Sequence, residues 1–213
     1  MKKPNLMRIY MKKRRLFLFA VILLLLAGNL KGEQTQEVRE FARGSWEGNV
    51  FTSEFAGLKF TMPPNWLAGS DEEIAALMGV SLDFLSDLGI RFSERMIELT
   101  TIYDMMAQNP FNGDSVALMF ENLAVHIGGG QITETLYLEI LRGQLNSLGM
   151  GYTFSDITET VIAGKPFKTL EAALYDFGFS QFYHARRIGN FMSIIVVTID
   201  FGNDDMILSF SAL

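Results

Sequence analysis

Histidine is the side chain most often used to transfer protons near neutral pH, and this chain contains only two, His126 and His184. His126 follows a predicted strand and precedes three glycines, whereas His184 lies in the middle of a predicted strand beside Arg186 and Arg187. A catalytic dyad or a metal site requires a carboxylate or a serine placed beside a histidine. The spacing shows no such neighbour, so we expect structural or surface roles for both histidines.

Carboxylates offer a second route to acid–base chemistry. Asp104 and Glu121 fall on neighbouring predicted strands, and a hydrolase that used them as a pair would hold both in one cleft with raised pKa values. Asp200, Asp204 and Asp205 are close in sequence, but they neither alternate as calcium ligands do nor lead to a bidentate Glu. We expect these three acids to surround the start of a short helix capped by Asn203.

Nucleophile and phosphate motifs are incomplete. Gly178-Phe179-Ser180-Gln181-Phe182 lacks the second glycine of the serine-hydrolase turn. Gly128-Gly129-Gly130 precedes a predicted helix, but Gln131-Ile132-Thr133-Glu134 follows where a phosphate loop has Lys and Ser or Thr, so a flexible link is expected. The sequence therefore predicts no catalytic, cofactor-binding or metal-ligating residue, and it leaves any ligand-binding residue unknown.

Isolated cations and methionines are the remaining candidates. Arg142, Arg186 and Arg187 are expected on a solvated face, with a carboxylate of a partner as the alternative. The chain has 12 methionines. Flexible thioethers can line a peptide groove, but they more often fill gaps in a core, which is the role expected here. Trp66 is expected to pack the first helix against the sheet.

The hydrophobic pattern predicts a strand pair, a helix, a second strand pair, a second helix, a strand meander and a closing helix, which we interpret as an α+β domain. Strands are expected at 46–52, 58–62, 100–107, 115–123, 152–155, 158–162, 167–175, 179–188 and 191–199. A capping box at Ser70 begins a helix whose apolar face is Ile74, Leu77, Met78, Leu82 and Leu85, with Gly79 weakening it midway. A second helix, 133–148, presents Leu136, Ile140, Leu141, Leu145 and Leu148, and 203–213 is expected to form a short helix.

The leader, residues 1–32, has the pattern of a signal peptide or N-terminal membrane anchor. Lys12-Lys13-Arg14-Arg15 precedes the apolar run Leu16–Ala27, which is short for an ordinary membrane span, and Met11 is an alternative start. Leu26-Ala27-Gly28-Asn29 resembles a lipoprotein signal, but Asn29 replaces the cysteine that accepts lipid. We therefore expect an exported protein, extracellular or tethered to the outer face of the cytoplasmic membrane by an uncleaved Leu16–Ala27 segment.

Charge and composition narrow the classes of partner. Beyond the leader, residues 33–45 are predicted to be a polar linker and 46–213 a single domain, and residues 33–213 hold ten Lys or Arg and 24 Asp or Glu, a formal charge of −14. Such an acidic body repels nucleic acid and anionic lipid. The absence of cysteine excludes disulfides, thiolate metal sites and cysteine nucleophiles.

Two stretches resemble PsbP-like domains of uncharacterised bacterial surface proteins: the opening Asn49–Trp66, with its aromatic-x-Ser-x-aromatic-x-Gly-Leu and Pro-x-x-Trp pattern, and Arg187-Ile188-Gly189-Asn190-Phe191. The resemblance extends over residues 46–212 and implies an antiparallel sheet sandwiched by helices, an α/β/α arrangement. It supplies no catalytic residues, because relatives of this fold act mainly by binding proteins. The chain departs from many members of the group at Asn29.

These observations predict an exported, non-catalytic binding module without a cofactor. Its expected partner is a protein or peptide at the bacterial cell surface. Two alternatives stay open: a small-ligand carrier with an apolar pocket between the sheet and the helix at Leu136–Leu148, and a hydrolase that uses Asp104 and Glu121. The sequence does not indicate an oligomeric state.

Overall fold

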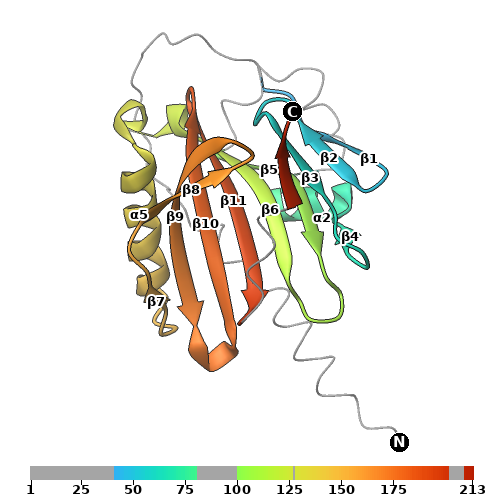
Figure 1. The fold of residues 1–213 in the computed structure, drawn as a ribbon. Helices are drawn as coiled ribbons and strands as arrows, with labels where there is room; N and C mark the ends of the chain where they lie inside the picture. The colour runs from blue at the N-terminus through green and yellow to red at the C-terminus, as the bar shows by residue number, and fades with distance from the viewer. Residues whose placement is uncertain (1–40, 81–99, 127, 202–208) are drawn as a thin grey trace, which may run out of the picture.

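The large sheet of this protein is antiparallel throughout and has the strand order β4-β5-β6-β11-β10-β9-β7, with β8 also pairing with β9 (Figure 1). The structure is a computed structural model, and it describes residues 41–80, 100–126, 128–201 and 209–213. The strands of this sheet are β4 (Leu67–Ala68), β5 (Thr101–Gln108), β6 (Ser115–Asn122), β7 (Thr153–Phe154), β8 (Thr158–Ile162), β9 (Lys165–Leu174), β10 (Phe179–Ile188) and β11 (Phe191–Asp200).

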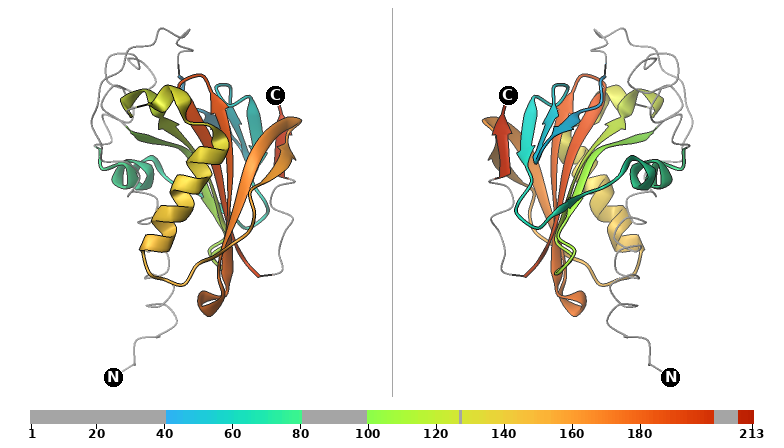
Figure 2. Two further views of the ribbon diagram at one scale, coloured as in Figure 1. Left: turned by 90° about the vertical axis from the view of Figure 1, so that its left-hand side faces the viewer. Right: turned by 90° about the vertical axis from the view of Figure 1, so that its right-hand side faces the viewer.

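A smaller antiparallel sheet has the order β1-β2-β3-β12 and packs on one face of the large sheet. Its strands are β1 (Ser45–Glu47), β2 (Val50–Ser53), β3 (Leu58–Thr61) and β12 (Phe210–Ala212). The helices α2 (Asp71–Met78) and α5 (Glu134–Ser147) lie on the opposite face (Figure 2). The predicted α+β class, with helices packed on an antiparallel sheet, is confirmed, and the large sheet lies between a helical layer and a second sheet.

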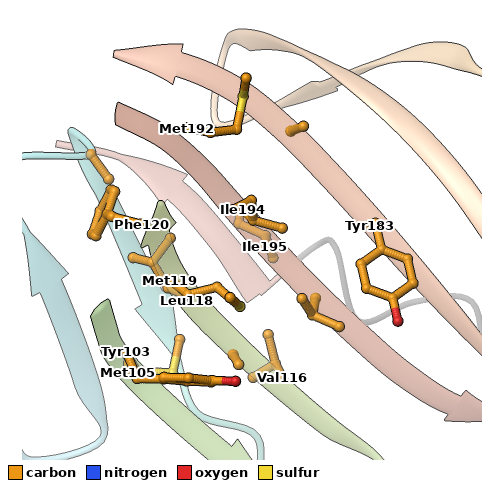
Figure 3. Close-up of a cluster of buried hydrophobic side chains, with 14 of the residues drawn as sticks. Tyr103, Met105, Val116, Leu118, Met119, Phe120, Tyr183, Met192, Ile194 and Ile195 are labelled. Carbon is orange, nitrogen blue, oxygen red and sulfur yellow. The ribbon is translucent and has the colours of Figure 1, made fainter. Parts of the chain in front are cut away.

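The centre of the large sheet is β11, as its continuous apolar sequence predicts. Every residue from Phe191 to Ile199 is buried, because β6 and β10 flank the strand and both of its faces are covered. The predicted turn Gly189-Asn190 joins β10 to β11. Met105, Met119 and Met192 are at most 1% exposed and belong to the same buried core as Ile194 and Ile195 of β11 (Figure 3), which confirms the core role expected for these methionines.

Aromatic rings fill the space between the two sheets. The Phe120 ring of β6 lies 5.1 Å from the rings of both Phe41 and Phe55, measured between centroids, and Phe191 lies 5.4 Å from Phe55. The contacts with Phe120 and the Phe55–Phe191 contact are edge-to-face, the geometry that the charge distribution of aromatic rings favours. This cluster therefore joins the small sheet to the centre of the large one.

The described residues before Ser45 pack against the rest of the domain, although the sequence predicts that they belong to the linker. Phe41 is 2% exposed, the Arg43 guanidinium lies 3.1 Å from Asp71, and the amide of Gly44 donates to Asp104 at 2.7 Å. The prediction of a linker through residue 45 was thus wrong for 41–45. The polar composition concealed a single phenylalanine that docks into a core formed by residues far away in the sequence.

Two elements near the start of the domain differ in extent from their predictions, because a glycine with positive φ interrupts or ends each one. The predicted strand 46–52 is a hairpin, because Gly48 has a φ of +60° and turns the chain between β1 and β2. The capping box at Ser70 is confirmed, with Glu73 as its partner. Gly79 ends α2 with a φ of +66° rather than weakening a longer helix, and the predicted positions Leu82 and Leu85 lie outside the described residues.

The C-terminal residues form a strand, not the end of the predicted helix 203–213. β12 pairs with β3, and the Phe210 ring lies 5.0 Å from the ring of Phe60. Residues 202–208, with Asn203, Asp204 and Asp205, lie outside the described residues. Phe210 of this tail is buried against the small sheet, a partner that a local pattern does not reveal.

The helices of the described ranges are all too short or too polar to cross a membrane, and the predicted anchor Leu16–Ala27 lies outside those ranges.

Candidate functional site

A group of polar side chains is buried between the large sheet and α5. We call Tyr103, Glu121, His126 and Tyr137 the Glu121 cluster. Glu121, at the end of β6, is 0% exposed; its Oε2 accepts from the Tyr137 hydroxyl at 3.0 Å, and its Oε1 lies 3.4 Å from His126 Nε2. The β-strand alternation places Glu121 on the face under α5, and Tyr137 reaches it from the first turn of that helix.

Burial and the Glu121 carboxylate both act on the tyrosines of this cluster. Burial raises the pKa of Tyr137 well above its usual range, and the nearby negative charge of Glu121 adds to the effect. Burial, and then the same carboxylate, also raise the pKa of Tyr103. Both phenols therefore stay protonated at any physiological pH, and Tyr137 acts as a hydrogen-bond donor.

A second network continues along the same face. Gln181 Oε1 accepts from the Tyr183 hydroxyl at 3.0 Å and from the Tyr152 hydroxyl at 3.4 Å, and its amide donates to Thr198 at 3.3 Å. Burial raises the pKa of Tyr183 well above its usual range and that of Tyr152 to about 12. The layer between sheet and α5 therefore contains neutral hydrogen-bond donors with one buried carboxylate, rather than the purely apolar surfaces expected for a carrier pocket.

The predicted apolar face of α5 is rotated as a result. Leu136 is 46% exposed, whereas Tyr137 and Leu138 are buried at 3% and 0%. Leu141 and Leu145 are buried as predicted. Sequence periodicity assigns the leucines, and not Tyr137, to the buried face of the helix. Tyr137 is buried because its hydroxyl donates to the Glu121 carboxylate while its ring packs on the sheet.

The structure does not bring Asp104 and Glu121 together as a pair. Asp104 follows Tyr103 at an irregularity in the pairing of β5 with β6, and its carboxylate accepts from the amide of Gly44 on the side of the small sheet. Glu121 faces α5 instead. A general acid and a general base must both reach one substrate, so this geometry gives the pair no common site.

The two histidines occupy different layers. His184 lies on β10 with its Nδ1 2.8 Å from the Thr169 hydroxyl, and the Phe182 ring is parallel to it. Burial lowers the pKa of His184 to about 4, so it is neutral at pH 7. His126 belongs to the Glu121 cluster. The Ser180 hydroxyl donates to Glu171 at 2.7 Å. Within the described residues, no hydrogen bond joins Ser180 to His126 or His184.

The predicted structural roles of the histidines agree with these contacts. Over the described ranges, no group of three or more His, Cys, Asp or Glu side chains is placed to hold a metal ion.

The three arginines contact backbone carbonyls of their own chain. Arg187 donates to Gly130 and Ile132 at 2.8 and 3.0 Å, and its backbone amide donates to Glu134 at 3.0 Å. Arg186 donates to Ala56 at 3.2 Å. Arg142 bridges Glu139 and the carbonyl of Ser155 at 3.2 and 2.9 Å. They hold separate segments together, which differs from the solvated face expected from the sequence.

Gly129 has a steric role in the loop that positions His126. Gly129–Gln131 form a short helix within this link, and a Cβ on Gly129 would come 1.7 Å from the carbonyl oxygen of Leu123. We expect Gly129→Ala to lower the free energy of unfolding by about 2–3 kcal/mol, because backbone must move. Guanidinium chloride denaturation measures this change.

Gly143→Ala is the matched control. Gly143 lies inside α5, and a Cβ there meets no atom within 4 Å. This substitution should raise the free energy of unfolding by about 0.5–1 kcal/mol, because alanine favours the helix. Equal effects of the two substitutions would contradict the steric role of Gly129.

The buried carboxyl of Asp104 predicts a pH dependence of stability. Burial raises its pKa to about 6 from 3.8, and the amide of Gly44, the hydroxyl of Ser53 and the guanidinium of Arg43 offset this only in part. Because the folded state holds the proton more tightly, Asp104 favours folding below pH 3.8 and this contribution is lost as pH rises through 6. His184 acts in the opposite sense, favouring folding above pH 6.5 and losing that contribution as pH falls towards 4.

Asp104→Asn should separate the two effects. The amide oxygen keeps the acceptor for Gly44 and the amide cannot ionise, so the slope due to Asp104 is lost and that due to His184 is retained. We expect the stability difference between variant and wild type to shift in favour of the variant by about 2 kcal/mol between pH 4.5 and pH 7. Urea denaturation at both pH values gives this difference, and other titrating groups cancel in it. A constant difference would contradict the raised pKa.

The turns and strand ends at one end of the large sheet, the lower end in Figure 1, carry several exposed aromatic side chains. We call this the aromatic end and define it by five exposed side chains on the turns and strand ends there. They are Phe111 (77%), Tyr175 (66%), Leu67 (55%), Phe201 (46%) and Phe177 (42%). The pairing register places these segments at the same end, because Leu67 opposes Gln108, Ser115 opposes Thr198, and Asp200 opposes Phe179, which itself opposes Leu174.

Sequence reasoning missed the aromatic end. The composition of Asn109–Asp114 predicts a turn, but it does not show that the side chain of Phe111 is exposed there. Tyr175 and Phe201 are 26 positions apart in the sequence, and their rings stack at 5.1 Å. An aromatic residue beside turn formers at several strand ends is the signal that could have found the patch.

Comparisons with known proteins add one likeness in fold. No protein-family model matches the chain, and no curated protein matches it in sequence. Among solved structures, the fold is similar to the solution structure of cyanobacterial PsbP (CyanoP) from Synechocystis sp. PCC 6803, with a TM-score of 0.45 and 8% sequence identity. The alignment covers 84% of this chain and 98% of that one.

Proposed function

We propose that this protein is an exported, non-catalytic binding module that recognises a protein or peptide at the bacterial cell surface. One observation carries the proposal: the acidic and histidine side chains best suited to chemistry point into the molecule, whereas large apolar side chains are exposed on the turns and strand ends of the aromatic end, where Tyr175 and Phe201 stack. Glu121, Asp104 and His184 are 0%, 1% and 4% exposed. An exposed cluster of large apolar side chains is typical of a binding surface.

The rigidity of the turns supports this proposal. Gly178 donates to the carbonyls of Leu174 and Tyr175 at 3.0 and 3.1 Å, which fixes the turn that carries Tyr175. The Asn109 side chain accepts from the amide of Phe111 at 2.9 Å. Side chains presented on fixed turns lose little conformational entropy on binding, so each contact contributes more to the affinity.

Crosslinking on intact cells tests the proposed function. The full chain is crosslinked where it is exported, crosslinked polypeptides are identified, and direct binding of each is measured by calorimetry with purified components. We expect one polypeptide to bind saturably. A purified protein that binds no recovered polypeptide, and instead retains a small molecule identified by mass spectrometry, would overturn the proposal in favour of a carrier.

A further inference from the structure

We infer that the aromatic end recognises a peptide segment in which apolar side chains stand next to lysine or arginine. This inference rests on the proposed binding function and adds the surface and the chemistry of the partner. Five of the eight exposed large hydrophobic side chains of the described residues lie there; the other three, Leu136, Val161 and Leu213, are on α5, on β8 and at the C-terminus.

The shape of the patch favours side-chain recognition. Tyr175 and Phe201 stack at 5.1 Å with an angle of 18° between their planes, and the amide of Phe201 donates to the carbonyl of Gly178 at 3.4 Å. The amide of Asp200 donates to the Asp114 carboxylate at 3.0 Å, which ties the end of β11 to the Phe111 turn. Aromatic side chains that are fixed in this way dominate the energetics of many protein interfaces.

Charge selects the type of partner. The segments that build this end, residues 63–68, 108–115, 174–180 and 199–201, contain no lysine or arginine, and Asp176 is exposed between Tyr175 and Phe177. The basic residues Lys165, Lys168, Arg186 and Arg187 lie towards the opposite ends of β9 and β10. Exposed aromatic rings beside the carboxylate of Asp176, with no lysine or arginine in these segments, attract cationic side chains by charge and by cation–π contact and do not favour anionic lipid.

A random peptide library displayed on phage, selected on the immobilised full chain, tests the inference. We expect selected peptides to combine an aromatic or large aliphatic residue with lysine or arginine. The triple variant Phe111→Ser, Tyr175→Ser, Phe201→Ser should bind them at least about tenfold more weakly. Asp176→Lys should weaken them as well, and added salt should weaken binding to the wild type.

The control is Leu136→Ser with Val161→Ser, which removes two exposed apolar side chains away from the aromatic end. We expect this variant to bind the selected peptides as the wild type does. Equal binding of the peptides by the triple variant would overturn the aromatic end as the surface and leave the binding function standing. Selection of no peptide would count against the proposed function itself.

Two further measurements distinguish other occupants. Phosphatidylglycerol vesicles that bind the wild type and not the triple variant would assign the surface to a membrane and overturn the inference. Concentration-dependent self-association in sedimentation that the triple variant abolishes would assign it to a second copy of the chain. The inference expects neither result.

Discussion

Glu121→Ala is expected to lower the free energy of unfolding by about 3–4 kcal/mol. The Tyr137 hydroxyl, which donates to Glu121 at 3.0 Å, would lose its acceptor in a place from which water is excluded. The deleted side chain would also leave a cavity beneath α5. Guanidinium chloride denaturation followed by circular dichroism measures the change.

Glu121→Gln is the informative control. Its amide oxygen can accept from Tyr137 and its amide nitrogen can face the Nε2 atom of His126, so we expect the stability to change by about 1 kcal/mol or less. Tyr137→Phe, which removes only the donor, should cost about 1–3 kcal/mol. In a double-mutant cycle, Glu121→Ala and Tyr137→Phe should be less than additive, because both remove the same hydrogen bond.

These variants also separate a structural role of the Glu121 cluster from a chemical one. If the cluster only fixes α5 on the sheet, Glu121→Gln should bind peptides selected on the aromatic end as the wild type does. If glutamine were as destabilising as alanine, the negative charge of Glu121 itself would be needed, and the hydrogen bond to Tyr137 would not explain the role of Glu121.

The strands and turns of this fold follow closely from local sequence. Gly189-Asn190 between two long apolar runs predicts the β10–β11 hairpin, and the β-branched run Ile194–Val197 predicts the central strand; both are confirmed. The reason is physical: a two-residue turn and period-two alternation together determine the register of an antiparallel pair. The capping box at Ser70 is equally local, and it too is confirmed.

The features missed by the sequence depend on partners that are distant in the chain. Phe41 packs against Phe55 and against Phe120 and Phe191, which lie 79 and 150 positions further along the chain, and nothing in its polar surroundings indicates these contacts. β12 forms because it pairs with the edge of β3, and Tyr137 faces inward because its hydroxyl donates to the buried carboxylate of Glu121. Charge and hydrophobic periodicity describe one element at a time, so neither shows which elements meet.

Phe120→Ala is expected to destabilise the protein by about 3–5 kcal/mol, a loss comparable with that of Glu121→Ala. Phe120 is 0% exposed and contacts the rings of Phe41 and Phe55, so its removal opens a cavity where the two sheets meet. Phe120→Leu, which keeps most of the volume, should cost less. Phe111→Ala removes a ring that is 77% exposed and should change the stability by no more than about 0.5 kcal/mol.

Hydrogen exchange can locate this loss within the fold. The Phe41, Phe55 and Phe120 rings are among the contacts that attach the small sheet to the large one, whereas the β10–β11 ladder is paired over ten residues. In Phe120→Ala, the amides of β2 and β3 should therefore exchange faster than those of β11, because the small sheet separates by local opening before the large sheet unfolds. Uniform acceleration across both sheets would show that they unfold as one unit and that the aromatic cluster is not the weak boundary between them.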